Sequence, residues 1–459
     1  MDLATLGLDG RLLIVADLLR RGKASEALGA INERTADSDG GFLAPLLRGW
    51  AEQLAGLDGA KRLTGLAADS LLTPFADEQR AAMLLAGRRV DEALPLIEAA
   101  LGDAGGRETR LRLGFAAALV EARARDRARR LLTGTDPALR RINLDRPQRG
   151  LAINTPAAGL SELLIATAVS LSRDDNRALP LGLAQIARHA SPDNSDANLL
   201  TALFLERQDR RRDALAVLAR IPPDDPFAED ALDSSARLLL ADQRGGEALR
   251  LAHRQTTGRA ATAADFARLG NVFDELKRHG EAADAFARGA AIADREGAAD
   301  RWTYRLLGAA QLDKLKRWPD ALAQLELGFK ASPNEPLLLN YLGYNSIERG
   351  ENLDAAEAMI RRALALRPGD ASITDSLGWA LYKRGRLPEA IDVLRTASAA
   401  DPGQFEIDEH LGDALFAAGR RYEARFAWRA ALVASEEVAD RARIEAKIGA
   451  GLTKETAAP

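Results

Sequence analysis

Histidine has the widest chemical range of the residue types in this sequence, because an imidazole can transfer protons or bind a metal ion. The chain has four, at His189, His253, His279 and His410, and no H-E-x-x-H pair or other metal-binding spacing joins them. The 459 residues include no cysteine, which excludes thiol nucleophiles, Cys-ligated zinc and disulfides. Phosphate-binding glycine loops and the G-x-S-x-G turn are also missing. We predict no enzyme, no metal site and no cofactor.

Charged residues are abundant but balanced. The chain has 63 basic and 67 acidic residues, a net charge of −4, so it is not a typical nucleic-acid binder. Arginine runs at 123–130 and 210–212 are interpreted as solvated helix faces. Hydrophobic residues make up 47% and aromatic residues 5%, with few β-branched runs. This composition predicts an all-α protein.

No segment reaches 18 uninterrupted apolar residues, the length that a membrane-spanning helix needs. The most apolar stretch, 160–171, is short and contains Ser161 and Glu162. The first residues show no secretory signal, because Asp9, Arg11 and Asp17 interrupt any apolar region. The protein is therefore expected either in the cytoplasm or as a trimmed form of an exported chain.

A repeat of 34 to 35 residues organises the second half of the sequence. Leu-Gly pairs recur at 269–270, 307–308, 342–343, 377–378 and 411–412, and the last three intervals are 35, 35 and 34 residues. A second glycine follows at Gly350, Gly385 and Gly419. Two small-residue positions and a closing proline keep the same period. Small residues allow two antiparallel helices to approach, and the second glycine suits a positive φ between them.

Larger residues recur in the second helix of each expected hairpin, at Leu325, Ile360, Leu394 and Trp428. We expect them to fill the gaps between hairpins. Because one hairpin cannot bury its apolar face alone, neighbouring hairpins must stack into a continuous core.

This pattern resembles the tetratricopeptide repeat (TPR) over 262–437, and more loosely upstream. The resemblance implies a right-handed α-solenoid, a TPR superhelix of about a dozen antiparallel helix hairpins. We predict degenerate TPR-like repeats in 1–134 and 159–261, a well-formed array in 262–437, and a terminal helix with a frayed tail in 438–459. Residues 135–158 contain three prolines and no clean helical period. They are interpreted as an irregular loop or hinge, or as a decayed repeat.

In a TPR array the first helix of each hairpin lines a concave groove. Counting from the Leu-Gly anchors, the stripe of first-helix residues not used for packing combines aromatic rings with acids and amides. Such a surface suits an extended peptide or a partner helix. The alternative is that Trp379 and Tyr344 simply pack against the neighbouring helix. The predicted protein-binding residues are Asn340, Tyr341, Tyr344, Asp375, Ser376, Trp379, Tyr382, Glu409, His410, Asp413 and Phe416.

The TPR clamp that holds C-terminal carboxylates of chaperones needs cations on these helices, whereas this chain has Asp375 and Glu409 there. A chaperone-tail receptor is not expected. The segments 339–356, 374–382 and 409–413 instead resemble proteobacterial envelope TPR lipoproteins, including the partner of a carboxyl-terminal processing protease. The resemblance implies an adaptor that holds a protease or its substrates in the periplasm or at the outer membrane. A cytoplasmic TPR scaffold or regulator is the alternative.

Overall fold

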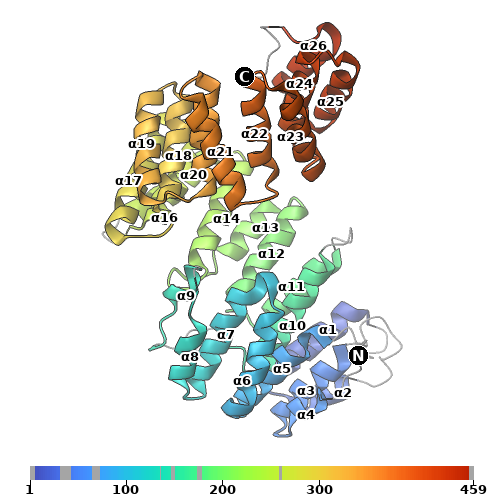
Figure 1. The fold of residues 1–459 in the computed structure, drawn as a ribbon. Helices are drawn as coiled ribbons and strands as arrows, with labels where there is room; N and C mark the ends of the chain where they lie inside the picture. The colour runs from blue at the N-terminus through green and yellow to red at the C-terminus, as the bar shows by residue number, and fades with distance from the viewer. Residues whose placement is uncertain are drawn as a thin grey trace. The chain divides into compact units, whose positions relative to one another are not determined.

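The computed structural model describes residues 6–31, 43–64, 73–134, 136–145, 150–172, 178–257 and 261–453. The described residues form helices and connecting turns, without a strand. They confirm the all-α prediction. None of the described helices is long and apolar enough to cross a membrane. The chain divides into two compact units, Met1–Leu251 and Ala252–Pro459, which are considered separately below (Figure 1).

Unit 1 is built mainly of short antiparallel helices. In chain order they are α1 (Leu8–Arg20), α2 (Ala24–Ala30), α3 (Ala44–Leu54), α4 (Gly59–Arg62), α5 (Thr73–Ala86), α6 (Val90–Gly102), the 3-10 turn η4 (Gly105–Arg107), α7 (Glu108–Glu121), α8 (Arg125–Leu131), α9 (Ala138–Arg141), α10 (Pro156–Leu171), α11 (Ala178–Ala190), α12 (Ser195–Arg207), α13 (Arg211–Leu218) and α14 (Ala228–Ala241). Helix α15 (Gly245–Thr256) contains the point at which the two units divide.

Helix α10 is the core of unit 1. Every residue from Ala158 to Ala168 is buried, including Ser161 and Glu162, because α10 contacts α1, α3, α5, α11 and α12 (Figure 1). A helix that is apolar all round requires cover on every side. Helix α1 provides part of that cover by lying beside α11, where His189 Nε2 is 3.4 Å from Asp17 Oδ1. The repeat pattern did not predict this contact between α1 and α11, which are far apart in the sequence.

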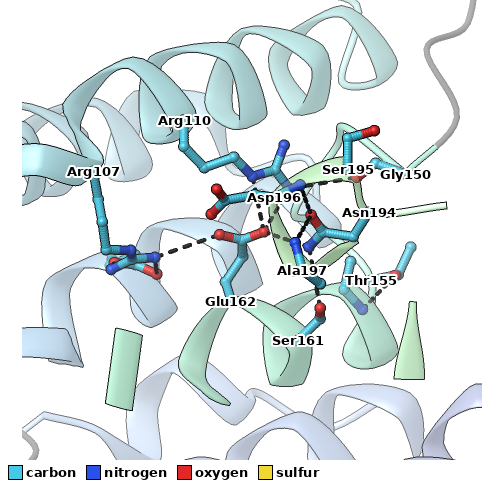
Figure 2. Close-up of polar contacts among 12 residues, drawn as sticks. Arg107, Arg110, Gly150, Thr155, Ser161, Glu162, Asn194, Ser195, Asp196 and Ala197 are labelled. Atoms are coloured by element: carbon cyan, nitrogen blue, oxygen red, sulfur yellow. Dashed lines mark hydrogen bonds and ion pairs between the residues drawn. The ribbon is translucent and has the colours of Figure 1, made fainter. Parts of the chain in front are cut away.

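Glu162 is held by a buried ionic cluster (Figure 2). Arg110 Nε donates to Glu162 Oε1 at 3.1 Å, and Arg107 Nη2 lies 3.4 Å from the other carboxylate oxygen. Arg107 also forms a two-bond pair with Glu78 of α5, at 2.9 and 3.1 Å. Asn194, the N-cap of α12, donates to Glu162 at 2.9 Å. The cluster therefore joins α5, η4, α7, α10 and α12 through paired charges.

The described part of 135–158 belongs to unit 1. It contains α9 and an ordered segment in which Leu151 and Ile153 are buried, before Thr155 caps the N-terminus of α10. Thr135 and residues 146–149 lie outside the described residues. The hinge therefore stays a prediction, whereas the division between the compact units lies much later, between Leu251 and Ala252.

Unit 2 continues with helices in regular pairs. They are α16 (Ala263–Glu275), α17 (His279–Glu296), α18 (Arg301–Lys314), α19 (Trp318–Ala331), α20 (Pro336–Arg349), α21 (Leu353–Leu366), α22 (Ala371–Lys383), α23 (Leu387–Ala400), α24 (Phe405–Ala417), α25 (Arg421–Ala434) and the terminal α26 (Val438–Ala450). Each pair from α16/α17 to α24/α25 is an antiparallel hairpin (Figure 1). The predicted hairpins are thereby confirmed; the tail after residue 453 lies outside the described residues.

The glycines of the repeat occupy the predicted roles. Gly350, Gly385 and Gly419 have φ of 70°, 74° and 81°, the left-handed conformation that closes the first helix of each hairpin. Four of the Leu-Gly glycines, Gly270, Gly343, Gly378 and Gly412, allow close contact between the two helices of one hairpin. A Cβ at Gly343 would lie 2.6 Å from Ile360 Cγ1, and one at Gly378 would lie 2.5 Å from Leu394 Cγ.

This contact corrects one expectation. Ile360 and Leu394 do not simply fill gaps between hairpins, because each lies over the Leu-Gly glycine of its own hairpin. Trp428 lies over Gly412 in the same way. The large residue and the glycine therefore form a complementary pair in these three repeats, whereas a Cβ at Gly308 would lie 3.4 Å from Phe286 Cβ of the preceding hairpin rather than against Leu325.

The pairing makes Gly378→Leu a direct test of the repeat register. The added side chain would overlap Leu394, and overpacking of this kind costs about 1–3 kcal/mol. We expect a lower thermal unfolding midpoint by circular dichroism. Leucine at Gly280, where a Cβ would meet nothing within 4 Å, is the matched control and should be nearly neutral. Equal midpoints for the two variants would show that the register is wrong.

Candidate functional site

An open pocket of about 530 Å³ lies on the first helices of unit 2. Helices α18, α20, α22, α24 and α26 contribute its lining, so the pocket crosses successive hairpins. Seven of the eleven predicted binding residues line it: Asn340, Tyr341, Tyr344, Asp375, Ser376, Glu409 and His410. The further lining residues are Asp313, Asn345, Ser372, Phe405, Glu406, Asp440 and Arg443.

Trp379 and Tyr382 do not line the pocket. The Trp379 indole is buried, 2% exposed, and stacks between Tyr382 and His410 with ring centroids 4.7 and 4.1 Å away. Its Nε1 donates to Glu348. Trp379 therefore packs against neighbouring helices, as the alternative interpretation expected. Replacing Trp379 by alanine would test the stability of the core and not a binding surface.

Asp413 and Phe416 also lie outside the pocket. Asp413 is 1% exposed and accepts hydrogen bonds from Lys447 Nζ at 2.8 Å and Trp428 Nε1 at 2.9 Å. The ring of Phe416 packs against Trp428, with 5.5 Å between centroids. Both side chains join α24 to its neighbours, α25 and α26, in the local core.

Cations from neighbouring helices compensate most carboxylates of the pocket. Arg349 pairs with Asp313, and Arg443 pairs with Glu409 at 2.8 Å and with Asp440 at 2.6 Å. Glu409, although buried, has a lowered pKa because its bonds to Arg443 and Lys447 outweigh desolvation. The buried carboxylates of the pocket are thus neutralised by cations of the same chain.

His410 and Asp375 form a buried pair on adjacent first helices. His410 Nδ1 lies 3.0 Å from both carboxylate oxygens of Asp375. Burial disfavours the imidazolium, but the Asp375 carboxylate outweighs burial and raises the pKa of His410. This pair fixes the wall between α22 and α24. The pair does not belong to a larger cluster of metal ligands, because the described residues include no group of three or more His, Asp or Glu side chains that could hold a metal ion.

Three groups of the pocket remain available to a ligand. Asn340 Oδ1 is buried and has no hydrogen-bond partner among the described residues. Glu406 is exposed at the rim and forms no ion pair with any side chain that the structure describes. Tyr344 contributes a mostly buried phenol to the same pocket. Burial raises the pKa of this phenol, and the nearby carboxylates of Glu348, Asp375 and Glu406 raise it further. The free groups are an amide acceptor, a carboxylate and a neutral aromatic ring.

Comparison with known proteins agrees with the helical repeats of this region. The family model described as "Tetratricopeptide repeat" matches residues 345–405 and 376–442. A TPR repeat-containing protein of Pseudomonas aeruginosa is 36% identical over 73 residues, which is 15% of this chain and 12% of the relative. Residues 345–442 of this chain carry tetratricopeptide repeats. The matched stretch spans about an eighth of the length of that relative.

Solved structures with similar helices were also found. The APC/C hetero-tetramer Cut9–Hcn1 matches with a TM-score of 0.41 and 16% identity, covering 96% of this chain and 89% of that chain. Yeast Tom70 matches with a TM-score of 0.46 and 11% identity, covering 95% and 87%.

The TPR register explains which pocket residues could have been found by sequence. Ser372, Phe405 and Glu406 lie one helical turn before predicted residues of the same helices, so on α22 and α24 the pocket uses an earlier part of the helix than expected. Asp440 and Arg443 come from α26, which stands outside the repeat period. No feature of the repeat pattern could have placed them at the pocket.

Proposed function

We propose that this chain is a non-catalytic scaffold that binds an extended protein segment in the pocket of unit 2. The observation that carries the proposal is a pocket crossing four successive first helices and α26, with polar groups that no other side chain uses. TPR folds serve protein-protein interaction, and a groove over several hairpins offers contact to several consecutive residues of a partner.

The chemistry of the pocket favours a partner segment with a basic side chain. Among the residues that the structure describes, Glu406 and Asn340 Oδ1 have no partner, so they supply a carboxylate and a hydrogen-bond acceptor. A guanidinium or ammonium group donates several hydrogen bonds and accepts none, so it satisfies both groups. The rings of Tyr344 and Phe405 add faces for the aliphatic stem and the charge.

A peptide-display selection against the full chain tests this function. We expect the selected peptides to contain arginine or lysine, and to bind the double variant N340A/E406Q about tenfold more weakly in fluorescence anisotropy, because hydrogen bonds to charged groups are worth roughly 1.5–3 kcal/mol. Glu445→Gln removes an exposed carboxylate outside the pocket and is the matched control. Peptides that bind both variants equally would contradict the pocket assignment.

The cellular role that we propose is an adaptor of the bacterial envelope, presenting a carboxyl-terminal processing protease or its substrates. Its support is the resemblance of 339–356, 374–382 and 409–413 to envelope TPR lipoproteins. Affinity purification of the native protein after mild crosslinking distinguishes this role from a cytoplasmic scaffold. Recovery of such a protease, with loss of recovery in N340A/E406Q, is the expected result. Recovery of cytoplasmic enzymes or regulators instead would overturn the envelope role and leave the scaffold intact.

A further inference from the structure

A second polar surface lies in unit 1, on α11 and α13. Two adjoining hollows of about 700 and 330 Å³ share the side chains Gln185, Arg188 and Arg220. The larger hollow extends to α1, and the smaller one to α12 and α13. We call the continuous surface formed by these two hollows the basic trough.

The two arginines that both hollows share, Arg188 and Arg220, lack acidic partners among the described residues. Among the residues that the structure describes, no carboxylate forms an ion pair with Arg188 or Arg220. Burial of Arg188 and the repulsion from Arg220 lower the pKa of the Arg188 guanidinium.

Two of the three nearby carboxylates are engaged in ion pairs, and the third, Asp9, lies at one end of the surface. Asp213 pairs with Arg210 at 2.7 Å on α13. Asp17 is shared by Arg20 and Arg21 at 2.8 Å each and by His189 at 3.4 Å. Asp9 lines the α1 end of the larger hollow and forms no ion pair with the described side chains.

The floor between the arginines is apolar. Ile186 lines the larger hollow, and Leu205 and Val217 line the smaller one; all three are buried. Leu13 lies at the edge of the larger hollow with 42% of its surface exposed. Two neighbouring cations above an apolar floor match a peptide in which carboxylates alternate with apolar side chains.

We propose that the basic trough binds an acidic segment of a protein partner, with side-chain carboxylates on Arg188 and Arg220 and apolar side chains against the floor. An arginine presents two parallel donors that match the two oxygens of a carboxylate, and the apolar floor adds contacts for the neighbouring side chains of a peptide. This site is separate from the pocket of unit 2 and does not depend on the function proposed for that pocket.

Fluorescence anisotropy with the full chain tests the proposal. The probe is a labelled peptide of alternating glutamate and leucine, and its glutamine-leucine analogue is the uncharged reference. We expect the acidic probe to bind, the analogue to bind at least tenfold more weakly, and R188Q/R220Q to weaken the acidic probe about tenfold. N340A/E406Q should bind it like the wild type, which separates the two sites.

The control variant R140Q/R212Q removes the same charge from exposed positions outside the basic trough. It should leave the affinity unchanged. The thermal midpoint of R188Q should equal or exceed that of the wild type, since no ion pair is lost, whereas a structural role for Arg188 predicts a lower midpoint.

Three binding results and one competition result would overturn the proposal. The binding results are equal binding by R188Q/R220Q and the wild type, equal weakening by both arginine double variants, and tighter binding of a labelled single-stranded oligothymidylate than of the acidic peptide. Displacement of the peptide by inorganic phosphate at equal concentration would assign the arginines to phosphate groups and count against a peptide site as well.

Discussion

Replacing Lys447 by methionine should lower the stability of unit 2 by about 3–5 kcal/mol, the usual loss when one partner of a buried ion pair is removed. Lys447 is fully buried, and its Nζ donates to Glu409 at 2.6 Å and to Asp413 at 2.8 Å. Without it, Glu409 keeps Arg443, but Asp413 keeps only the Trp428 indole. The pKa of Asp413 is raised, because burial disfavours its charged form more strongly than the attraction of Lys447 favours it.

Denaturant unfolding, read by tryptophan fluorescence, and hydrogen exchange of α24 and α26 would measure this loss. Lys330→Met, at an exposed position, is the matched control and should change stability little. Adding Asp413→Asn to the methionine variant should recover part of the lost stability, because it removes the uncompensated charge. A methionine variant as stable as the control would show that the lysine does not hold α26 against α24.

Glu162→Gln should destabilise unit 1 by a similar amount, about 3–5 kcal/mol. Glu162 is 0% exposed, and the glutamine would leave Arg110 buried without a carboxylate partner. Arg107 would keep its pair with Glu78. Hydrogen exchange of α7 and α10 should become faster, while exchange in unit 2 remains unchanged.

The same substitution should change the acid response of unit 1. Burial raises the pKa of Glu162, but Arg110 and Arg107 outweigh burial and hold it below its ordinary value of 4.5. The stability that this carboxylate contributes is therefore complete above pH 4.5 and is lost as the pH falls through the lower pKa of the folded state. In Glu162→Gln this part of the acid loss should disappear. Glu98→Gln, at an exposed position, should keep the wild-type profile.

The hairpins of unit 2 could be predicted because their geometry depends on local residue types. A glycine under a large side chain, as in Gly378 and Leu394, leaves a periodic trace in the sequence. The candidate site was predictable in part for the same reason, since the first helices carry it. Periodicity identifies a face, however, and does not reveal how far a neighbouring helix covers that face. Trp379 was therefore included in the stripe although His410 and Tyr382 enclose it.

The features that escaped prediction all depend on residues distant in sequence. Arg443 lines the pocket from α26, a helix outside the repeat. Helix α1 contacts α11, although helices α2 to α10 lie between them in the chain. Glu162 was a usable signal. A carboxylate within the most apolar stretch of the chain indicates a buried acid that needs cations, but their identity requires the fold.

The contact between α1 and α11 has a consequence for the order in which the chain acquires structure during synthesis. Asp17 and His189 are 172 positions apart, so α1 cannot complete its contacts until α11 has left the ribosome. The hairpins of unit 2 join helices that follow one another, and contacts between near neighbours form quickly. We expect α1 to remain partly uncovered until α10 and α11 emerge, since α2 and α3 contact it only in part, while each hairpin of unit 2 closes soon after it emerges. Helix α1 is therefore exposed to chaperones and to aggregation for longer than the helices of those hairpins.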